Sequence, residues 1–249
     1  MSTANTLNDW FVTPQGQYLL AREQAFFDNS VTDIFGFNAL QLGLPEHDFL
    51  RNSRMPLHVM AGKEAGGQVR LEAGELPFEC GSLDLVLLPH ALEFNAHPHQ
   101  VLREVERVLM PEGHLIISGF NPRSLWGIRR AAGSRVGYPW CGNFIALPRL
   151  KDWLALLGLE VVAGRFTCYA PPFANPGLLN RFQFMEPAGD RWWAICGGAY
   201  CLQAIKRVPG MRLIKPKWNE GLVGKLLPAA PKLNREVSQR TNQNPNDNE

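Results

Sequence analysis

The stretch from Leu83 to Gly119 constrains the fold more than any other part of the chain. Residues 83–88 form an almost uninterrupted apolar run, typical of a strand covered on both faces. Residues 98–110 place Val and Leu on one side and charged residues on the other, which predicts an amphipathic helix. A Pro-Glu-Gly sequence at 111–113 ends that helix, and residues 115–119 form a second apolar strand. Strand, helix and strand with short connections predict a βαβ unit with parallel strands and a right-handed crossover.

A helix is expected near the amino terminus. Thr13 supplies a capping hydroxyl and Pro14 stands at the first helical position, so the helix should run from Pro14 to about Asp28. The side chains expected to face inward are Tyr18, Leu19, Ala25 and Phe26.

Three apolar segments precede the central unit and are expected to be strands, at residues 39–44, 57–61 and 68–72. The helices between them are poorly marked, and residues 45–54 have room for a short helix at most.

The segments after the central unit are less regular. We expect a long loop with a short helix at 124–132, a helix at 147–157, a strand beginning at Leu159, a proline-rich insertion at 171–190, and a last strand at 198–205.

Charge and composition limit the classes of protein that this chain can belong to. The 249 residues are 45% hydrophobic and carry a net charge of +2, which argues against wholesale nucleic-acid binding and global disorder. The first residues lack a secretory pattern, and no apolar run reaches the roughly 20 residues of a membrane-spanning helix. Five scattered cysteines without a Cys-x-x-Cys motif are typical of free thiols in a reducing cytoplasm, where we expect the protein to be located.

The carboxyl-terminal segment differs in composition from the rest. From Lys206 onward there are nine Lys and Arg against four Asp and Glu, and the last residues are polar. We therefore expect residues 208–249 to be a basic, disordered tail. The Lys, Trp and Leu residues at 215–227 leave open a contact with a membrane surface or RNA, although prolines and glycines favour a flexible tail.

One stretch of the chain resembles a known family. Glu72, followed by Leu-Pro-Phe at 76–78, Gly-Ser-Leu-Asp-Leu-Val at 81–86 and Arg-Val-Leu-Met-Pro-Glu-Gly at 107–113, is similar to the core of the class I S-adenosylmethionine (SAM)-dependent methyltransferases. The match is to the small-molecule group labelled type 11, and to a proteobacterial branch of that superfamily. The resemblance covers roughly residues 10–207.

The resemblance implies a fold and a cofactor. The fold is α/β, a doubly wound, Rossmann-like sheet of seven strands with the last strand antiparallel, as a single domain at 1–207 with its core at 36–121. The cofactor is SAM, bound at the carboxyl ends of the strands. Glu72 stands at the position whose carboxylate meets the adenine amino group. The cofactor-binding candidates are Leu42, Gly43, Glu72, Ala73, Leu88 and His90.

The first turn departs from the family pattern. Gly43 is kept, but Pro45 and His47 stand where glycines are usual, and Gln41 stands where an acidic residue is common. The second strand ends in Met60-Ala61-Gly62, where the family has a carboxylate for the ribose hydroxyls.

Several polar residues have two interpretations. His90 follows the fourth strand and is a candidate general base, or it makes local hydrogen bonds. His97 and His99 suggest a metal pair, but no carboxylate or cysteine completes it, and we expect no metal site. The arginines after the fifth strand are either receptors for an anionic substrate or ordinary surface residues; they are Arg123, Arg129, Arg130 and Arg135.

The function that the resemblance implies is that of a SAM-dependent methyltransferase acting on a small molecule. The alternative is a methyltransferase-like protein that has lost cofactor binding and serves as a binding or regulatory module. A nicotinamide-dependent oxidoreductase ranks last, since the chain lacks a glycine-rich first turn with a ribose-binding acid.

Overall fold

The computed structural model describes residues 4–63, 67–133 and 136–208. They form one seven-stranded sheet in the order β3-β2-β1-β4-β5-β7-β6. The strands are β1 Asn38–Leu42, β2 Leu57–Gly62, β3 Val69–Arg70, β4 Leu83–Pro89, β5 Leu109–Phe120, β6 Leu159–Thr167 and β7 Ala199–Lys206. The helices are α1 Leu7–Phe11, α2 Pro14–Thr32, α3 Pro98–Val108, α4 Leu125–Ala132, α5 Leu147–Leu156, α6 Pro176–Arg181, α7 Met185–Trp192 and the 3-10 helix η1 Ala194–Cys196.

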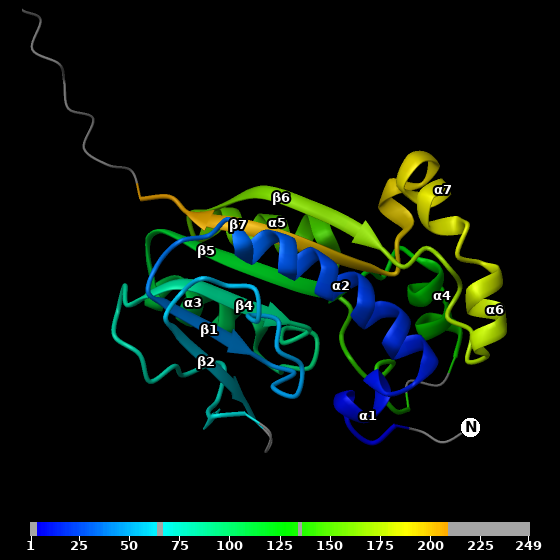
Figure 1. The fold of residues 1–249 in the computed structure, drawn as a ribbon, viewed down its shortest axis with the longest axis horizontal. Helices are drawn as coiled ribbons and strands as arrows, with labels where there is room; N and C mark the ends of the chain where they lie inside the picture. Colours follow the sequence, from blue (N-terminus) through cyan, green and yellow to red (C-terminus); the bar gives the residue numbers. More distant parts are fainter. Residues whose placement is uncertain (1–3, 64–66, 134–135, 209–249) are drawn as a thin grey trace, which may run out of the picture. The chain divides into compact units, whose positions relative to one another are not determined.

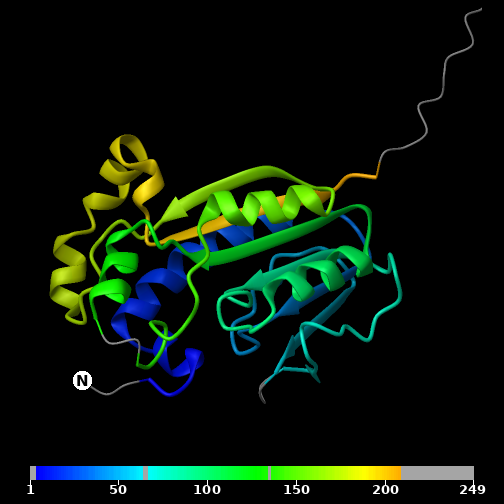
Figure 2. The same cartoon turned by 180° about the vertical axis from the view of Figure 1, so that it is seen from behind.

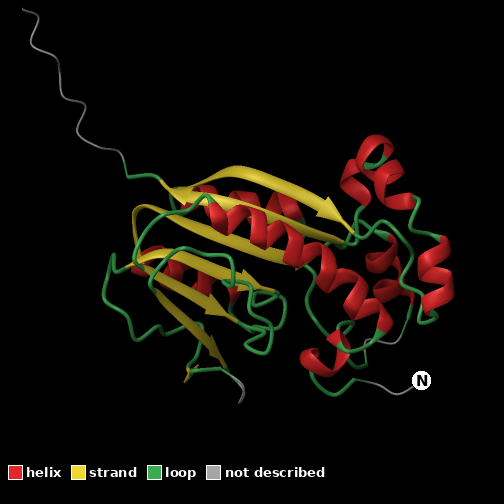
Figure 3. Cartoon of the chain, in the orientation of Figure 1, coloured by secondary structure: helices red, strands yellow, loops and turns green. Residues whose placement is uncertain are grey.

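Helices cover both faces of the sheet. α2 crosses one face, and α3 and α5 lie on the other, as Figures 1 and 2 show from opposite sides. The remaining helices gather beyond one end of the strands (Figure 3). Strands β1 to β5 are parallel, whereas β7 is antiparallel to both β5 and β6. This is the doubly wound sheet with an antiparallel last strand that the sequence predicts.

β4 has a core on each face because alternate side chains point to opposite sides. Leu85 and Leu87 pack with the core under α2, and Val86 and Leu88 pack with the core under α3 and α5. All four are fully buried, as the continuous apolar run predicts.

The central βαβ unit is confirmed, with one change of boundary. α3 ends at Val108, and β5 begins at the next residue. The Pro-Glu-Gly sequence at 111–113 therefore lies within the strand, where Glu112 adopts a φ of 63°. Met110, predicted as helical, is part of β5.

α2 begins where the capping residues predict, with the Thr13 hydroxyl accepting a hydrogen bond from Gly16 N. It continues to Thr32, beyond the predicted end near residue 28. The predicted inward face is correct for Tyr18 and Leu19 but wrong for its second half. Ala25 is exposed and Phe26 half-buried, and the residues that face the core are Glu23, Phe27 and Val31.

Loops rather than helices connect β1 to β2. The loop at 43–56 sends Phe49, Leu50 and Met55 into the core under α2. Its apolar side chains cover this part of the sheet in place of a helix, which explains the weak helical pattern in the sequence.

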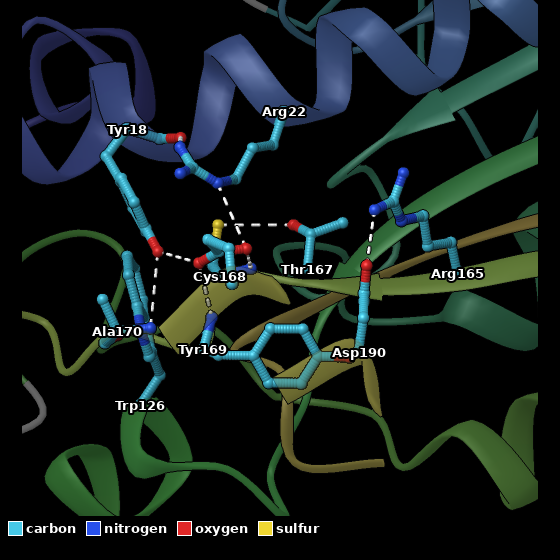
Figure 4. A network of polar contacts seen from close by, with 10 residues as sticks. Tyr18, Arg22, Trp126, Arg165, Thr167, Cys168, Tyr169, Ala170 and Asp190 are labelled. Atoms are coloured by element: carbon cyan, nitrogen blue, oxygen red, sulfur yellow. Dashed lines mark hydrogen bonds and ion pairs between the residues drawn. The ribbon is translucent and has the colours of Figure 1, made fainter. Parts of the chain in front are cut away.

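The proline-rich insertion predicted at 171–190 contains α6 and most of α7, and the helical segment continues through η1 to residue 196. Glu186 of α7 connects this segment to α2. Figure 4 shows its partners Tyr18, Arg22 and Tyr169. Its carboxylate accepts hydrogen bonds from the Tyr18 hydroxyl and from Tyr169 N, and pairs with Arg22 at 3.3 Å.

Within the described ranges, no helix is long and apolar enough to cross a membrane. The predicted tail at 208–249 lies outside the described residues from 209 onward.

Candidate functional site

A cavity of about 210 Å³ lies at the carboxyl ends of β1, β2 and β4. Its lining includes Leu42 and Gly43 after β1, Ala61 and Gly62 of β2, and Pro89 of β4. β1 pairs with β2 on one side and with β4 on the other, so the strand order reverses at this point. Open α/β sheets bind their ligands there. Pockets that enclose drug-sized ligands measure roughly 300–1,000 Å³, so a ligand of that size would have to displace side chains at the rim.

Gly43 forms the tight turn at the cavity. Its φ is 98°, a conformation that L side chains rarely adopt. A Cβ at this position would lie 3.0 Å from the carbonyl oxygen of Pro89 and 3.5 Å from Cβ of Ala91. The two strand ends therefore approach each other closely because residue 43 is a glycine.

Gln41 stands where the resemblance implies an acidic residue, and its amide holds the loop after β1. Its buried Nε2 donates to the carbonyl oxygens of Gly43 at 3.2 Å, Leu44 at 3.1 Å and His47 at 2.8 Å. Its Oε1 accepts from Phe49 N at 3.0 Å. A carboxylate has no N–H to donate, so an amide is required to hold this loop.

The two unusual residues of the first turn have different locations. Pro45 lines the cavity, whereas His47 does not. The His47 ring packs 5.5 Å from the Phe11 ring, between centroids, and 6.5 Å from that of Phe49. His47 therefore contributes to packing beside the site.

Glu72 lies at the mouth of the cavity in an ion pair. Lys63, the residue after β2, places its Nζ 3.1 Å from Glu72 Oε1, and both side chains are exposed. A cation thus follows β2, near the point where the resemblance implies a carboxylate for the ribose.

His90 lies in a buried cluster between two carboxylates. Its Nε2 is 2.8 Å from Glu23 Oε1 and its Nδ1 is 3.2 Å from Glu93 Oε1. All three side chains are buried. Burial opposes the charge on His90, but Glu23 and then Glu93 outweigh it and raise the pKa to about 10.

This geometry does not support His90 as a general base. The raised pKa keeps the imidazole protonated near neutral pH, so both ring nitrogens carry a proton and neither is free to take one from a substrate. The geometry supports the alternative interpretation, in which His90 makes local hydrogen bonds.

Five of the six predicted cofactor contacts line the cavity. Leu88 does not: it is fully buried and packs in the core under α3 and α5, because its side chain points to that face of β4. The five that line the cavity are Leu42, Gly43, Glu72, Ala73 and His90.

Five residues outside the strand ends also line the cavity and were not predicted. They are Leu7 and Asn8 of α1, Phe94 and Asn95 after β4, and Tyr138. One signal for α1 was available: Thr6 and Asp9 form a reciprocal capping box at its start.

The arginines after β5 are held by other parts of the chain. Arg129 donates to the carbonyl oxygen of Pro172 and lies 4.5 Å from the Trp140 ring. Arg130 donates to the Gly142 carbonyl at 2.7 Å and lies 5.0 Å from the Phe144 ring. Neither these two nor Arg123 lines the cavity, so an anion-binding role there is not supported; Arg135 lies outside the described residues.

His97 and His99 have separate environments. His97 is the residue before α3, and the His99 ring lies 3.8 Å from that of Trp153, between centroids.

Comparison with known proteins gives matches in sequence. Residues 55–117 match the family model described as a methyltransferase domain. The Escherichia coli (strain K12) protein YafS is 37% identical over 139 residues, covering 54% of this chain and 58% of that protein. The Mycobacterium bovis protein Mb2026c is 31% identical over 176 residues, covering 66% of this chain and 60% of that protein. The chain thus spans less than two thirds of the length of these relatives.

Solved structures share the fold. A Haloferax volcanii methyltransferase in complex with the activator Trm112 aligns over 83% of this chain and 98% of its own, with a TM-score of 0.56 and 11% identity. A SAM-dependent methyltransferase of Thermotoga maritima aligns over 76% of this chain and 93% of its own, with a TM-score of 0.55 and 15% identity. The resemblance drawn from the sequence is confirmed in two respects: residues 55–117 match the methyltransferase-domain model, and the chain has the fold of these SAM-dependent methyltransferases.

Proposed function

We propose that this protein binds SAM in the cavity at the ends of β1, β2 and β4 and transfers its methyl group to a small-molecule acceptor. The observation that carries the proposal is the close approach of the β1 and β4 ends at Gly43, located where the strand order reverses.

The residues at the cavity fit parts of the cofactor. The turn at Leu42 and Gly43 leaves room for a ligand against the backbone. Glu72 is the acceptor for the adenine amino group, with Ala73 beside it. Binding in this position exchanges the exposed Lys63–Glu72 pair for a contact between Glu72 and the ligand.

When bound, SAM supplies a methyl group that is already activated on a sulfonium. The protein therefore has to align the acceptor and exclude water rather than provide a reactive side chain. Leu7 of α1 and the Phe94 and Tyr138 rings, 5.1 Å apart between centroids, give the cavity an apolar part of its lining that helps to exclude water.

Free thiols support a cytoplasmic location. All five cysteines are unpaired, and Cys168 and Cys201 are buried. This usage is typical of a reducing compartment.

Titration calorimetry with SAM and with S-adenosylhomocysteine tests the proposal. We expect micromolar binding, about −8 kcal/mol, weakened at least about tenfold in Glu72→Ala through loss of a hydrogen bond to a charged acceptor. Glu79→Ala is the matched control, since Glu79 is exposed and does not line the cavity. Its affinity should equal that of the wild type.

A second candidate is a binding module without cofactor. The small cavity and the Lys63–Glu72 pair at its mouth favour it. If neither ligand gave heat or a thermal shift at millimolar concentration, this candidate would replace the methyltransferase, and a search for partners would follow.

A further inference from the structure

Large apolar side chains are exposed along α7 and the 3-10 helix η1. Trp192 is 72% exposed, Trp193 54% and Ile195 68%. Phe184, the residue before α7, is 64% exposed. We call these four residues the α7 tip. Single exposed apolar residues are ordinary on protein surfaces, whereas several large ones on one short segment mark a place of contact with another surface.

The two sides of α7 have different surroundings. Glu186 is held by α2, and Gly189 lies so close to the Tyr169 ring that a Cβ there would be 2.2 Å from Cγ of that ring. At 3.6 residues per turn, positions 184 and 191 lie on the opposite side of the helix, so Phe184 and Arg191 face outward. In Figures 1 and 2, α7 lies at the outer edge of the helices that gather beyond the strands.

The acidic side chains of residues 176–196 are neutralised by other elements, whereas the basic ones are not. Glu186 and Asp190 pair with arginines of α2 and β6, at 3.3 and 2.6 Å. Arg181 and Arg191 are exposed, and within the described ranges neither forms an ion pair. Arg191 lies 5.9 Å from the centroid of the Trp192 ring, beside the tip. The tip therefore presents apolar groups next to uncompensated positive charge.

This chemistry is complementary to the surface of an anionic lipid bilayer. Tryptophan concentrates at membrane–water interfaces because its ring is apolar while its N–H remains hydrogen-bonded among the headgroups. Arginine side chains are attracted by anionic headgroups. A projecting tip enters the deformable headgroup region without a matching groove, whereas a protein partner has to supply a complementary surface.

We propose that the α7 tip docks this protein onto membrane surfaces that contain anionic phospholipids. Trp192, Trp193 and Ile195 enter the headgroup region, and Arg181 and Arg191 lie against the lipid phosphates. The contact is peripheral and reversible, because it buries only a few side chains at the interface. This inference does not depend on the proposed methyl transfer.

Co-sedimentation of the full chain with lipid vesicles tests the inference. The vesicles contain phosphatidylcholine alone or equal parts of phosphatidylcholine and phosphatidylglycerol. We expect binding to the anionic vesicles that weakens with added salt, and weaker binding to the neutral ones. Trp192→Ser/Trp193→Ser should weaken binding at least about tenfold, because two large apolar contacts with lipid are lost.

The matched control for the tryptophans is Phe35→Ser/Phe37→Ser. Both phenylalanines are 72% exposed and lie before β1, at the other end of the sheet from α7. This variant should bind both kinds of vesicle as the wild type does. An equal loss of binding in the two double variants would overturn the role given to the α7 tip.

A second pair of variants tests the charges. Arg181→Glu/Arg191→Glu should weaken binding to the anionic vesicles at least about tenfold and leave binding to the neutral ones almost unchanged. Arg103→Glu/Lys151→Glu makes the same change in net charge at exposed positions of α3 and α5, and its effect should be smaller. Equal effects of the two charge variants would show attraction by net charge alone and would overturn the inference.

The remaining outcomes also decide the inference. All variants keep residues 209–249, so any contribution of that segment to lipid binding is common to them, and thermal denaturation checks that each variant is folded. Failure of the wild type to bind anionic vesicles would overturn the inference. If sedimentation velocity then showed self-association that Trp192→Ser/Trp193→Ser abolished, the tip would be a contact with a second copy of the chain instead.

Discussion

Gly43 and Gly81 both have a positive φ, 98° and 63°, but their surroundings differ. A Cβ at Gly43 would lie 3.0 Å from the Pro89 oxygen, whereas at Gly81 nothing lies within 4 Å. We expect Gly43→Ala and Gly81→Ala each to lower the free energy of unfolding by about 1–2 kcal/mol through the left-handed backbone. Only Gly43→Ala should also weaken SAM binding, because it moves the β4 end at the cavity.

Urea denaturation and calorimetry with SAM on both variants check this expectation. Equal SAM affinities in the two variants would contradict the role given to the Gly43 turn.

At the same scale, the sequence predicted residues at strand ends better than residues from elsewhere. Gly43 and Glu72 line the cavity because the carboxyl ends of parallel strands meet at one edge of the sheet. Asn8 and Tyr138 reach it from segments far away in the chain, and their approach depends on tertiary packing. The hydrogen bonds of Gln41 to the loop after β1 could likewise not be predicted, because that loop has no recognisable sequence pattern.

Among the elements, α7 depends on Glu186 for its attachment to α2. Beyond Tyr18, Arg22 and Tyr169 N, the carboxylate also accepts from Cys168 N at 3.3 Å. We expect Glu186→Ala to lower the free energy of unfolding by about 3 kcal/mol, because hydrogen bonds to a partly buried charge are lost together. Urea denaturation measures the loss, and limited proteolysis should show earlier cleavage within residues 171–196.

Asp190 in the same helix provides the control. Its partner Arg165 lies 2.6 Å away (Figure 4), and the two side chains are exposed, Arg165 to 63% and Asp190 to 39%. Asp190→Ala should therefore cost less than about 1 kcal/mol. A larger loss for Asp190→Ala than for Glu186→Ala would show that the attachment runs through the exposed pair instead.

Elements with a regular pattern were predicted well, and irregular ones were not. The apolar run of β4 and the amphipathic pattern of α3 required only local spacing. α6 and α7 have few apolar residues facing a core, with Leu179 and Gly189 as their buried positions. Their helices are stabilised by contacts such as Glu186 with Tyr18, which no local pattern reveals.

At the scale of the whole molecule, the buried cluster of Glu23, His90 and Glu93 joins α2 to the sheet. Glu23 comes from α2, His90 follows β4, and Glu93 Oε1 also accepts from Phe120 N at the end of β5, at 2.5 Å. Three segments thus converge on one imidazolium. Its protonation is coupled to global folding, because unfolding separates all of them.

This coupling predicts how stability depends on pH. The pKa of His90 rises from 6.5 to about 10 on folding, since Glu23 and Glu93 outweigh burial. Between these values the native state holds one more proton than the unfolded state. The stabilisation is complete below the lower pKa, and the free energy of unfolding then falls by up to about 1.4 kcal/mol per pH unit as pH rises. Urea denaturation at several pH values across this window measures the fall.

Glu23→Gln isolates the contribution of His90 from that of other groups. Burial raises the pKa of Cys168 and Cys201, which adds a fall of the same sign at alkaline pH in both proteins. Removing one carboxylate lowers the pKa of His90, so the fall due to His90 should shift to lower pH in the variant. NMR of the ring nitrogens should show both protonated at pH 8 in the wild type. Identical pH profiles for the two proteins, or a neutral ring at pH 8, would mean that the imidazole is uncharged and that a carboxylate carries the shared proton.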